Sequence, residues 1–463
     1  MMNIDNETIC AIATGQGGAI GIIRVSGIKA IEITDSIFTP ASGNSLCEKD
    51  AYTLTFGYIK DNENNIVDEV LISLFRSPHS YTGENSTEIM CHASSYILQK
   101  IIQLLISHGC RTAHPGEYTQ RAFLNGKMDL SQAEAVADLI TSSNEATHRL
   151  AMNQMRGGFS KELNTLRKQL LDFTSLIELE LDFSEEDVQF ADRTHLCTLA
   201  SHIEKVIAHL VQSFDMGNAI KNGIPVAIIG VTNAGKSTLL NFLVNEERAI
   251  VSDIHGTTRD VIEDTINIQG VTFRFIDTAG IRETADTIEN LGIERTFKKL
   301  NQATIVLWVI DSTTSNKQYC LLSEKILPHC KNKRLIRIFN KCDLLSKEQL
   351  EHLTFINKDT ESVFVSIKNK INTDAIQNLL AKYAMQPNIS QNDVIVTNIR
   401  HYESLTYALN AIHRVQEGLT TQLSGDLLSQ DIRECIFYLG NIVGEVSNNE
   451  ILENIFSKFC IGK

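Results

Sequence analysis

The sequence predicts a multidomain protein of mixed α+β and α/β class, in which an α/β domain is inserted into a helical domain. Three observations carry this prediction. Apolar strands alternate with helical stretches between Gly223 and about residue 383, a helical apolar period precedes and follows that stretch, and short β-branched runs with glycine turns occupy residues 1 to about 123. The predicted domains are 1–123, 124–217, 218–383 and 384–463, of which the second and fourth form one helical domain.

Composition and charge narrow the class of protein. The chain has 463 residues, of which 43% are hydrophobic, 21% are charged and only 6 are proline. This is the balance of an ordered, helix-rich chain, which excludes disorder and collagen-like structure. The formal net charge is −14. The surface as a whole therefore repels a phosphate backbone, so a nucleic acid has to be held by a local basic patch or by a second protein.

The sequence matches none of the patterns of membrane-spanning segments, targeting peptides and paired cysteines. No apolar run approaches the roughly 18 residues that span a bilayer. The first ten residues are polar and acidic, where a signal or transit peptide is basic. We expect a cytoplasmic protein without stable membrane insertion. The ten cysteines include no Cys-x-x-Cys pair, so we expect most of them to be reduced thiols that serve as small core residues.

The first domain is predicted to be α+β. Its short apolar runs, which read as strands, are Ile9 to Ala13, Gly21 to Val25 and Val70 to Phe75. Glycine turns separate them, which favours a compact sheet domain.

The helical domain is predicted from apolar stripes in two separate segments. The first stripe recurs at spacings of 3 and 4, and consists of Leu163, Leu166, Leu170, Phe173 and Ile177. The second stripe consists of Leu428, Ile432, Cys435, Leu439, Ile442 and Val443. An acidic run lies at residues 178–187, and we interpret it as a solvated helix end rather than a metal site, because no histidine accompanies it.

The inserted domain begins with a phosphate-binding motif. The predicted strand 224–230 runs directly into GVTNAGKS (230–237), which fits Gly-x-x-x-x-Gly-Lys-Ser between a strand and a helix. In such a loop the backbone N–H groups and the helix N-terminus surround the phosphates. Lys236 reaches the β and γ phosphates, and the hydroxyl of Ser237 binds magnesium.

Two further motifs concern the metal and the γ-phosphate. Asp277 ends the predicted strand of FRFIDTAG and can hold magnesium through water. Gly280 offers a backbone N–H to the γ-phosphate. Between the two metal-binding motifs, Thr258 in GTTRD supplies a second hydroxyl to the metal.

The last motifs identify the base. NKCD (340–343) ends a later strand, so the Asp343 carboxylate can accept hydrogen bonds from N1–H and the 2-amino group of guanine. Adenine lacks that donor pair. Ser366, Ile367 and Lys368 end the last strand and back the base with an N–H. The four motifs in this order predict a GTPase.

One position departs from the common small GTPases. The residue after DTAG, often a water-orienting glutamine, is Ile281, which cannot position water. Glu283, Asp286 and Glu289 follow in the same segment, and chemistry alone does not choose among them.

The chain resembles a known family. The resemblance rests on RTAHPGEYTQRAFLNGKMDLSQAEAVADLI (111–140), on NAGKS and DIHGTTRD in the inserted domain, and on the terminal FCIGK. These segments are similar to those of the bacterial MnmE (TrmE) tRNA-modification GTPases, within the TrmE-Era-EngA-like GTPases. The resemblance covers essentially the whole chain. Residues 115–140 and 460–463 are its most specific parts.

The resemblance implies potassium-dependent hydrolysis of GTP in a homodimer. A K⁺ ion replaces an arginine finger, and its ligands fall on Asn233, Ser252, Ile254 and Thr257, while the water-orienting glutamate falls on Glu289. Two GTPase domains are expected to meet across this ion. The implied GTP-binding residues are Asn233, Ala234, Gly235, Lys236, Ser237, Thr238, Ser252, Asp253, Ile254, His255, Gly256, Thr257, Thr258, Asp277, Thr278, Ala279, Gly280, Asn340, Lys341, Cys342, Asp343, Ser366, Ile367 and Lys368.

The resemblance also implies one-carbon chemistry. The first domain resembles folate-binding domains of aminomethyltransferases, and contacts to formyl- or methylene-tetrahydrofolate fall on Arg24, Glu88, Lys127 and Lys463. The cations suit the glutamate tail of folate, and Glu88 suits the donor edge of the pterin. Cys460 has two readings, a thiol near the folate carbon or a small residue that anchors the tail.

The implied partners are a flavoprotein and tRNA. With the flavoprotein MnmG, which carries FAD and uses NADH, the family adds aminomethyl or carboxymethylaminomethyl groups to the wobble uridine of certain tRNAs. Two alternatives remain from the sequence. A ribosome-assembly GTPase of the Era/EngA type requires an RNA-binding segment that the sequence lacks outside the GTPase. A folate-dependent aminomethyltransferase with a structural GTPase would tolerate a damaged nucleotide site, yet the motifs are intact.

Overall fold

The structure is a computed structural model that describes most of the chain. The described residues are 7–15, 17–182, 193–231, 233–247, 264–269, 271–276, 303–314, 316–330, 333–356, 361–384, 394–421, 423–446, 449–457, 459 and 462.

The chain forms two compact units. The first comprises Met1–Thr141, Ala151–Ala208 and Glu403–Lys463, and the second comprises Ser142–Leu150 and His209–Tyr402. The second unit interrupts the first in the sequence. This arrangement agrees with the predicted insertion of an α/β domain into a helical one.

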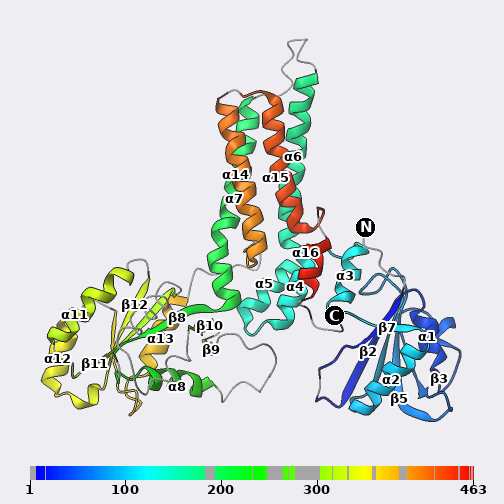
Figure 1. Cartoon of the computed structure of the whole chain (residues 1–463), viewed down its shortest axis with the longest axis horizontal. Helices are drawn as coiled ribbons and strands as arrows, with labels where there is room; N and C mark the ends of the chain where they lie inside the picture. The colour runs from blue at the N-terminus through cyan, green and yellow to red at the C-terminus, as the bar shows by residue number, and fades with distance from the viewer. Residues whose placement is uncertain are drawn as a thin grey trace. The chain divides into compact units, whose positions relative to one another are not determined.

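The first unit begins with a seven-stranded sheet in the order β3-β4-β5-β6-β2-β1-β7 (Figure 1). β1 and β7 are parallel, whereas the other neighbours are antiparallel. The elements are β1 (Thr8–Ile12), β2 (Ile20–Ser26), α1 (Ala30–Ser36), β3 (Phe38–Pro40), η1 (Leu46–Glu48), β4 (Thr53–Lys60), β5 (Ile66–Phe75), β6 (Ser86–His92), α2 (Ser95–Ser107) and β7 (Cys110–Thr112). The three predicted strands correspond to β1, β2 and β5.

The larger apolar core of this sheet lies on the face covered by α1 and α2, and a smaller cluster of Ile9, Ala11, Ala113 and Tyr118 lies on the other face. Ile23 and Val25 of β2 pack with Ile33 of α1 and with Ile101 and Leu105 of α2, and all five side chains are buried. Because side chains alternate along a strand, Arg24, which lies between Ile23 and Val25, faces the other side of the sheet.

The helical part of the first unit follows the predicted stripes. Its helices are α3 (Glu117–Leu124), α4 (Leu130–Thr141), α5 (Glu145–Met155), α6 (Gly158–Asp182), α7 (Arg193–Asn222), α14 (Ile399–Thr420), α15 (Gly425–Val443) and α16 (Asn449–Phe456), of which α5, α7 and α14 continue into the second unit. Every residue of both predicted stripes is buried. These stripes face each other where α6 packs along α15 (Figure 1).

Part of the acidic run lies at the end of α6. Glu178 forms an ion pair with Arg433 of α15, which agrees with a solvated helix end. The run from residue 183 onward lies outside the described residues.

The second unit contains a six-stranded sheet in the order β13-β12-β11-β8-β10-β9, parallel except for the β9–β10 pair. Its elements are β8 (Ile224–Ile229), α8 (Lys236–Glu247), β9 (Asp264–Ile268), β10 (Val271–Phe275), β11 (Ile305–Asp311), α11 (Asn316–Ile326), η3 (Leu327–Cys330), β12 (Arg334–Asn340), η4 (Cys342–Leu344), α12 (Lys347–Ile356), β13 (Ser362–Phe364) and α13 (Asp374–Ala384).

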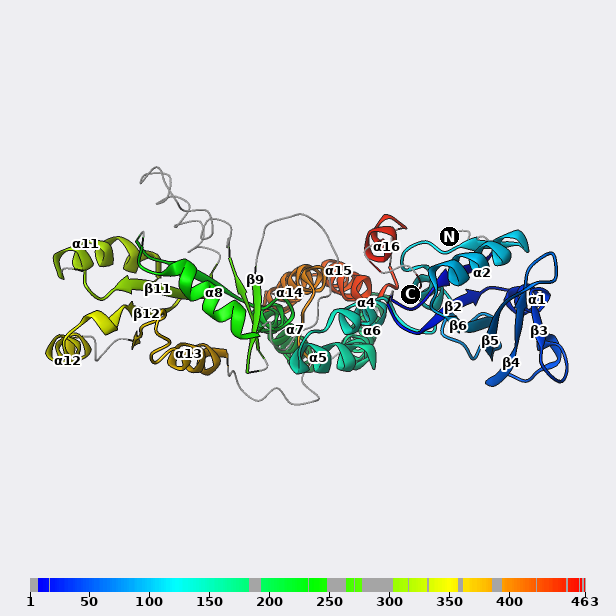
Figure 2. The ribbon, with the colours of Figure 1, turned by 90° about the horizontal axis from the view of Figure 1, so that it is seen from below.

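Helices cover both faces of this sheet (Figure 2). Val226 and Ile228 of β8 pack in one apolar cluster with Leu239 of α8 and Leu380 of α13. Ala227 and Ile229, the alternate residues of β8, pack in a second cluster that includes Ile326 of α11. Burial on both faces explains why the strand 224–229 is continuously apolar, and it confirms the predicted doubly wound sheet.

The cysteines only partly follow the prediction. All nine in the described part of the chain are free thiols, and Cys10, Cys91, Cys110, Cys330 and Cys435 are buried. Cys47, Cys197 and Cys320 are exceptions to the expected core position, because they are exposed. Each of these three lies on the solvent side of its local helix or turn. Among the described residues, no helix combines the length and the apolarity that a membrane span requires.

Candidate functional site

The predicted phosphate loop lies between β8 and α8. At Gly230, where φ is +151°, a Cβ atom would lie 2.3 Å from the carbonyl oxygen of Val309. At Gly235, where φ is +105°, a Cβ atom would lie 2.2 Å from Nδ2 of Asn340. Both positions therefore require glycine, which lets the backbone of the loop lie directly against Val309 and Asn340. α8 begins at Lys236, where the motif predicts a helix N-terminus.

The loop presents the groups that phosphate and magnesium require. Nζ of Lys236 donates hydrogen bonds of 2.9 Å to the carbonyl oxygens of Gly230 and Val231, so the ammonium lies over the loop. Ser237 follows in the first turn of α8. Asn233 is exposed and has a left-handed backbone with φ +65°. The tight glycine cradle and the adjacent hydroxyl fit a phosphate group with its magnesium ion.

Asn340 joins three of the predicted motifs. Its side chain is almost fully buried at the end of β12. Nδ2 donates to the carbonyl oxygen of Ala234 at 2.9 Å, and Oδ1 accepts from the backbone N–H of Ile367 at 3.1 Å. The phosphate loop, NKCD and the segment 366–368 are thereby held in one place.

The residues predicted to read the base follow directly in the sequence. Lys341 has φ +66°, and its Nζ lies 2.7 Å from Oδ2 of Asp311 at the end of β11. Burial acts to raise the pKa of Asp311, but hydrogen bonds from Lys341 and Thr313 outweigh it, so the pKa is lowered. Asp343 accepts a hydrogen bond of 3.0 Å from Nδ2 of Asn369. The Asp311–Lys341 pair was not predicted, because the carboxylate is far from the motif in the sequence.

Several predicted residues lie outside the described part of the chain. They are 252–258, 277–280, Glu289, Cys460 and Lys463. Their assignments stay predictions.

A second group of polar residues lies on the face of the N-terminal sheet opposite α1 and α2. Arg24 of β2 and Glu88 of β6 are direct cross-strand partners. Nε and Nη2 of Arg24 donate to Oε1 of Glu88 at 3.0 Å and 2.8 Å. The structure thus brings together two of the four predicted folate residues.

Two tyrosine rings flank the Arg24 side chain. The guanidinium carbon lies 5.5 Å from the ring centroid of Tyr81 and 5.7 Å from that of Tyr118, within the range of a cation–π contact. The hydroxyl of Tyr118 donates to the carbonyl oxygen of Arg24 at 2.8 Å. Sequence reasoning missed both tyrosines, since neither composition nor spacing indicates what an aromatic side chain will face.

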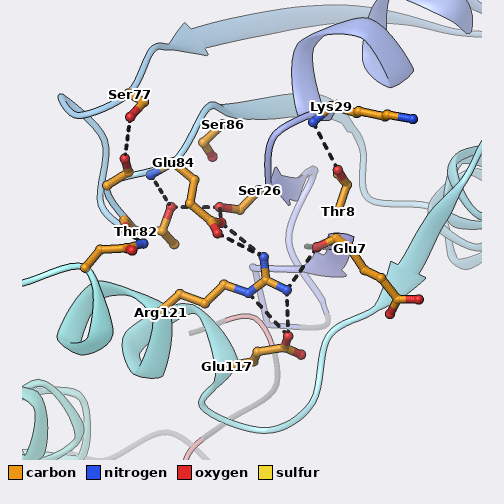
Figure 3. A network of polar contacts seen from close by, with 12 residues as sticks. Glu7, Thr8, Ser26, Lys29, Ser77, Thr82, Glu84, Ser86, Glu117 and Arg121 are labelled. Carbon is orange, nitrogen blue, oxygen red and sulfur yellow. Dashed lines mark hydrogen bonds and ion pairs between the residues drawn. The ribbon is translucent and has the colours of Figure 1, made fainter. Parts of the chain in front are cut away.

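A buried arginine connects this region to α3. Arg121, 1% exposed, lies between Glu84 and Glu117 and also donates to the carbonyl oxygen of Glu7 at 3.0 Å (Figure 3). Burial acts to raise the pKa of Glu117. Hydrogen bonds from Arg111, the N–H of His114 and Arg121 outweigh it and lower the pKa to about 2.

Lys127, the third predicted folate residue, contacts the loop between β5 and β6. Its Nζ donates to the carbonyl oxygen of Pro78 at 3.0 Å. In the same loop Gly83 has φ +79°, and a Cβ atom there would lie 3.3 Å from Cγ of Lys127. The loop therefore touches Lys127 by its backbone and Arg24 by Tyr81.

The C-terminal segment packs against the first sheet. Gly462 is buried, and a Cβ atom there would lie 2.5 Å from the carbonyl oxygen of Ile12. Ile12 ends β1, whose Ala11 pairs with Arg24. At Gly116, a Cβ atom would lie 2.6 Å from the carbonyl oxygen of Phe456 in α16. Gly462, which precedes Lys463, thus lies beside β1, the strand next to the strand β2 that carries Arg24.

Two family models match the chain. The model described as the MnmE helical domain matches residues 130–460, and the model described as the GTP-binding protein TrmE N-terminus matches residues 8–127.

Curated relatives match over the full length. A protein of Bacteroides fragilis (strain YCH46) named tRNA modification GTPase MnmE is 68% identical, over 99% of this chain and 100% of its own. Proteins with the same name from Bacteroides thetaiotaomicron and Flavobacterium johnsoniae are 67% and 52% identical, again over 99% of this chain and 100% of their own. Among solved structures, an Aquifex aeolicus Era variant bound to GDP and AlF4⁻ is 29% identical, covers 40% of this chain and 66% of that chain, and has a TM-score of 0.27.

Proposed function

The chain belongs to the MnmE family of tRNA modification GTPases, and from this premise we propose that it couples potassium-dependent GTP hydrolysis to one-carbon modification of the wobble uridine of certain tRNAs. Hydrolysis of GTP in tRNA modification is the activity of the family. The ion, the folate and the flavoprotein partner are the parts that we add to it.

The double hydrogen bond of Asn340 is the observation that best supports a working guanine-nucleotide site. It links the carbonyl oxygen of Ala234 in the phosphate loop to the N–H of Ile367 behind the base. A nucleotide bound there meets both segments at a fixed separation. Such preorganisation is what a phosphoryl-transfer site requires, because its catalysis consists mainly of positioning and electrostatic stabilisation.

We assign roles at this site by chemistry. Lys236 neutralises charge on the β and γ phosphates, and Asp343 selects guanine. Ser237 and Thr258 would hold Mg²⁺. The side chain of Asn233, together with Ser252, Ile254 and Thr257, would hold K⁺. When bound, the two cations would supply positive charge near the phosphates, where negative charge grows during transfer. Glu289 is assigned to orient the attacking water.

We assign the Arg24–Glu88 region to a formyl- or methylene-tetrahydrofolate. Glu88 would accept from the donor edge of the pterin, while Lys127 and Lys463 would pair with the carboxylates of the glutamate tail. Arg24 holds Glu88 in place through two hydrogen bonds. The position of Gly462 beside Ile12 supports a tail that reaches this region.

The remaining assignments complete the proposal. The protein is proposed to act in the cytoplasm as a homodimer, with the flavoprotein MnmG carrying FAD and taking electrons from NADH. The proposed domains are 1–123, 124–217, 218–383 and 384–463. We favour this function over ribosome assembly because the named relatives match over 99% of the chain, including the sheet and the helices outside the GTPase unit.

Mass spectrometry of tRNA nucleosides tests the proposal. A strain that lacks the protein is complemented with wild type, with Lys236→Ala or with Glu88→Gln. Wild type should restore an aminomethyl or carboxymethylaminomethyl group on the wobble uridine, whereas neither variant should. Unchanged tRNA nucleosides with and without the wild-type protein would refute the proposal.

A further inference from the structure

We propose that Tyr81 is the aromatic wall of the folate site, on which a flat pteridine ring stacks. The loop Arg76–Asn85 presents this side chain, and the buried Arg121–Glu84 pair positions the loop. The inference rests on the proposed folate function and names a further residue that determines ligand specificity.

The exposure of the two rings beside Arg24 distinguishes their roles. Tyr118 is 0% exposed and its hydroxyl bonds to the backbone of Arg24, so its ring is a fixed part of the core. Tyr81 is 36% exposed, so part of its ring is open to solvent. Of these two rings, only that of Tyr81 can contact a ligand that approaches Arg24 and Glu88.

The chemistry of the pair calls for such a wall. Arg24 and Glu88 form hydrogen bonds, which read the edge of a planar heterocycle but leave its faces without a partner. The Arg24 guanidinium lies over one face of the Tyr81 ring, so the opposite face is the one that can stack on the ligand. Stacking of a heterocyclic base on an aromatic side chain contributes substantially to affinity.

The loop that carries Tyr81 is held in one conformation. The hydroxyl of Tyr81 lies 2.8 Å from Oγ1 of Thr119 in α3. Nδ2 of Asn125 donates to the carbonyl oxygen of Thr82 at 2.7 Å. Both carboxylate oxygens of Glu84 accept from Nη1 of Arg121 at 3.1 Å (Figure 3). A binding side chain fixed in this way loses little conformational entropy when a ligand binds.

The same loop also contacts the third proposed folate residue. Nζ of Lys127 donates to the carbonyl oxygen of Pro78, three residues before Tyr81. The loop therefore contacts both the cation assigned to the glutamate tail and the pair assigned to the pterin. A ligand that spans these residues would lie next to it.

Calorimetric titration of the full-length protein with 5-formyltetrahydrofolate tests the proposal. Tyr81→Ala should weaken binding by about tenfold or more, because it removes the stacking face. Tyr81→Phe keeps the ring and should change the affinity by less than about threefold. Tyr96→Ala is the matched control, since Tyr96 is 70% exposed at the start of α2, which covers the other face of the sheet. Urea unfolding followed by circular dichroism, measured on each variant, reports whether the first unit, which contains both tyrosines, is folded.

A spectroscopic test does not depend on truncating the side chain. The chain contains one tryptophan, Trp308, in the core of the second unit. The variants Tyr81→Trp and Tyr96→Trp each add a second one. With 5-formyltetrahydrofolate, the added fluorescence should be quenched far more strongly at position 81 than at position 96. Equal quenching at the two positions would contradict stacking on Tyr81.

The outcomes separate this inference from the proposed function. If the wild type does not bind 5-formyltetrahydrofolate, the proposed folate function fails. If the wild type binds and Arg24→Ala abolishes binding, but Tyr81→Ala binds normally, the folate function stands and the role of Tyr81 is overturned. An equal loss in Tyr81→Ala and Tyr96→Ala also overturns it.

Discussion

Arg24 and Glu88 stand directly opposite one another on β2 and β6, with 2.8 Å between Nη2 and Oε1. Both side chains are 20% exposed. A surface ion pair generally contributes about 1 kcal/mol or less, but this pair is mostly buried, so breaking it should cost more. The contact can therefore serve both folding and ligand binding, and mutation measures the two effects separately.

Glu88→Gln should weaken the binding of 5-formyltetrahydrofolate by about tenfold or more, because a charged acceptor is lost from the donor edge of the pterin. The free energy of unfolding should fall as well, by roughly 1–3 kcal/mol, because the mostly buried Arg24 loses its charged partner. Calorimetry and denaturant unfolding measure the two effects. Glu69→Gln, at an exposed position of the neighbouring strand β5, is the control and should leave both unchanged. A loss of stability without a loss of affinity would show that the pair is structural.

Glu117 should make the first unit sensitive to acid. Its pKa is about 2 in the folded protein, against 4.5 for the free group. A lowered carboxyl pKa stabilises the fold above pH 4.5, and that stability is lost as the pH falls toward 2. The shift corresponds to about 3 kcal/mol. Glu117→Gln should be destabilised by about that amount at pH 7 and should lose less stability between pH 5 and pH 2 than wild type.

Urea unfolding at several pH values measures this difference. Circular dichroism follows both units, whereas the fluorescence of Trp308 follows the second unit alone. The acid-sensitive transition should appear by circular dichroism without a change at Trp308. Parallel pH profiles for wild type and Glu117→Gln would refute the role of Glu117.

Asp343→Asn should weaken GTP binding by roughly 10² or more and favour xanthosine triphosphate, whose exocyclic oxygen can accept from the new amide. Nucleotide titration of the variant measures both effects. Asn369→Ala is the comparison, since Asn369 only supports Asp343 through a 3.0 Å hydrogen bond. It should lower the affinity for GTP less and should not change the preferred base. Equal affinity of wild type for ATP and GTP would contradict the guanine assignment.

GTP hydrolysis should be much faster in potassium than in sodium at matched ionic strength, and Asn233→Ala should remove this preference. An arginine finger accelerates GTP hydrolysis by roughly 10³-fold to 10⁵-fold, which sets the upper limit for the acceleration expected from the ion. Asn233 has φ +65°, a conformation that strains alanine but not glycine. Asn233→Gly therefore controls for backbone strain and should lose the preference as well. Retained potassium dependence in both variants would exclude this residue as a ligand.

The sequence predicted the elements whose periodicity is set by burial. The stripe from Leu163 to Ile177 is buried because α15 covers it, and the strand 224–229 is apolar throughout because both faces are covered. The phosphate loop was predictable because Gly230 and Gly235 are required by close contacts with Val309 and Asn340.

The contacts between distant residues were not predictable. Tyr81 meets Arg24, and Asp311 meets Lys341, only because the sheet order brings separate strands together. The buried cluster around Arg121 is of the same kind, since its partners Glu7 and Glu84 lie far away in the sequence. Local spacing carries no information on such pairs.

The last prediction concerns the C-terminal tail. Deleting residues 460–463 should weaken folate binding and abolish tRNA modification, while GTP hydrolysis remains, because the nucleotide motifs belong to the second unit. Cys460→Ser distinguishes the two readings of that thiol. A chemical role predicts lost modification with folate affinity retained, whereas an anchoring role predicts a modest loss, since serine is nearly isosteric but more polar.

Gly462→Ala tests the docking of the tail without shortening it. Gly462 has φ +95°, and its new Cβ atom would lie 2.5 Å from the carbonyl oxygen of Ile12, so the tail has to move away from β1. Gly17→Ala is the matched control, because Gly17 has φ +103° but no atom within 4 Å of the Cβ position. Backbone strain is thus common to both variants, and the contact with Ile12 is not. Gly462→Ala should weaken 5-formyltetrahydrofolate binding and reduce wobble-uridine modification, with GTP hydrolysis unchanged, whereas Gly17→Ala should match wild type. If both variants bind folate and modify tRNA normally, the tail does not contribute to the folate site.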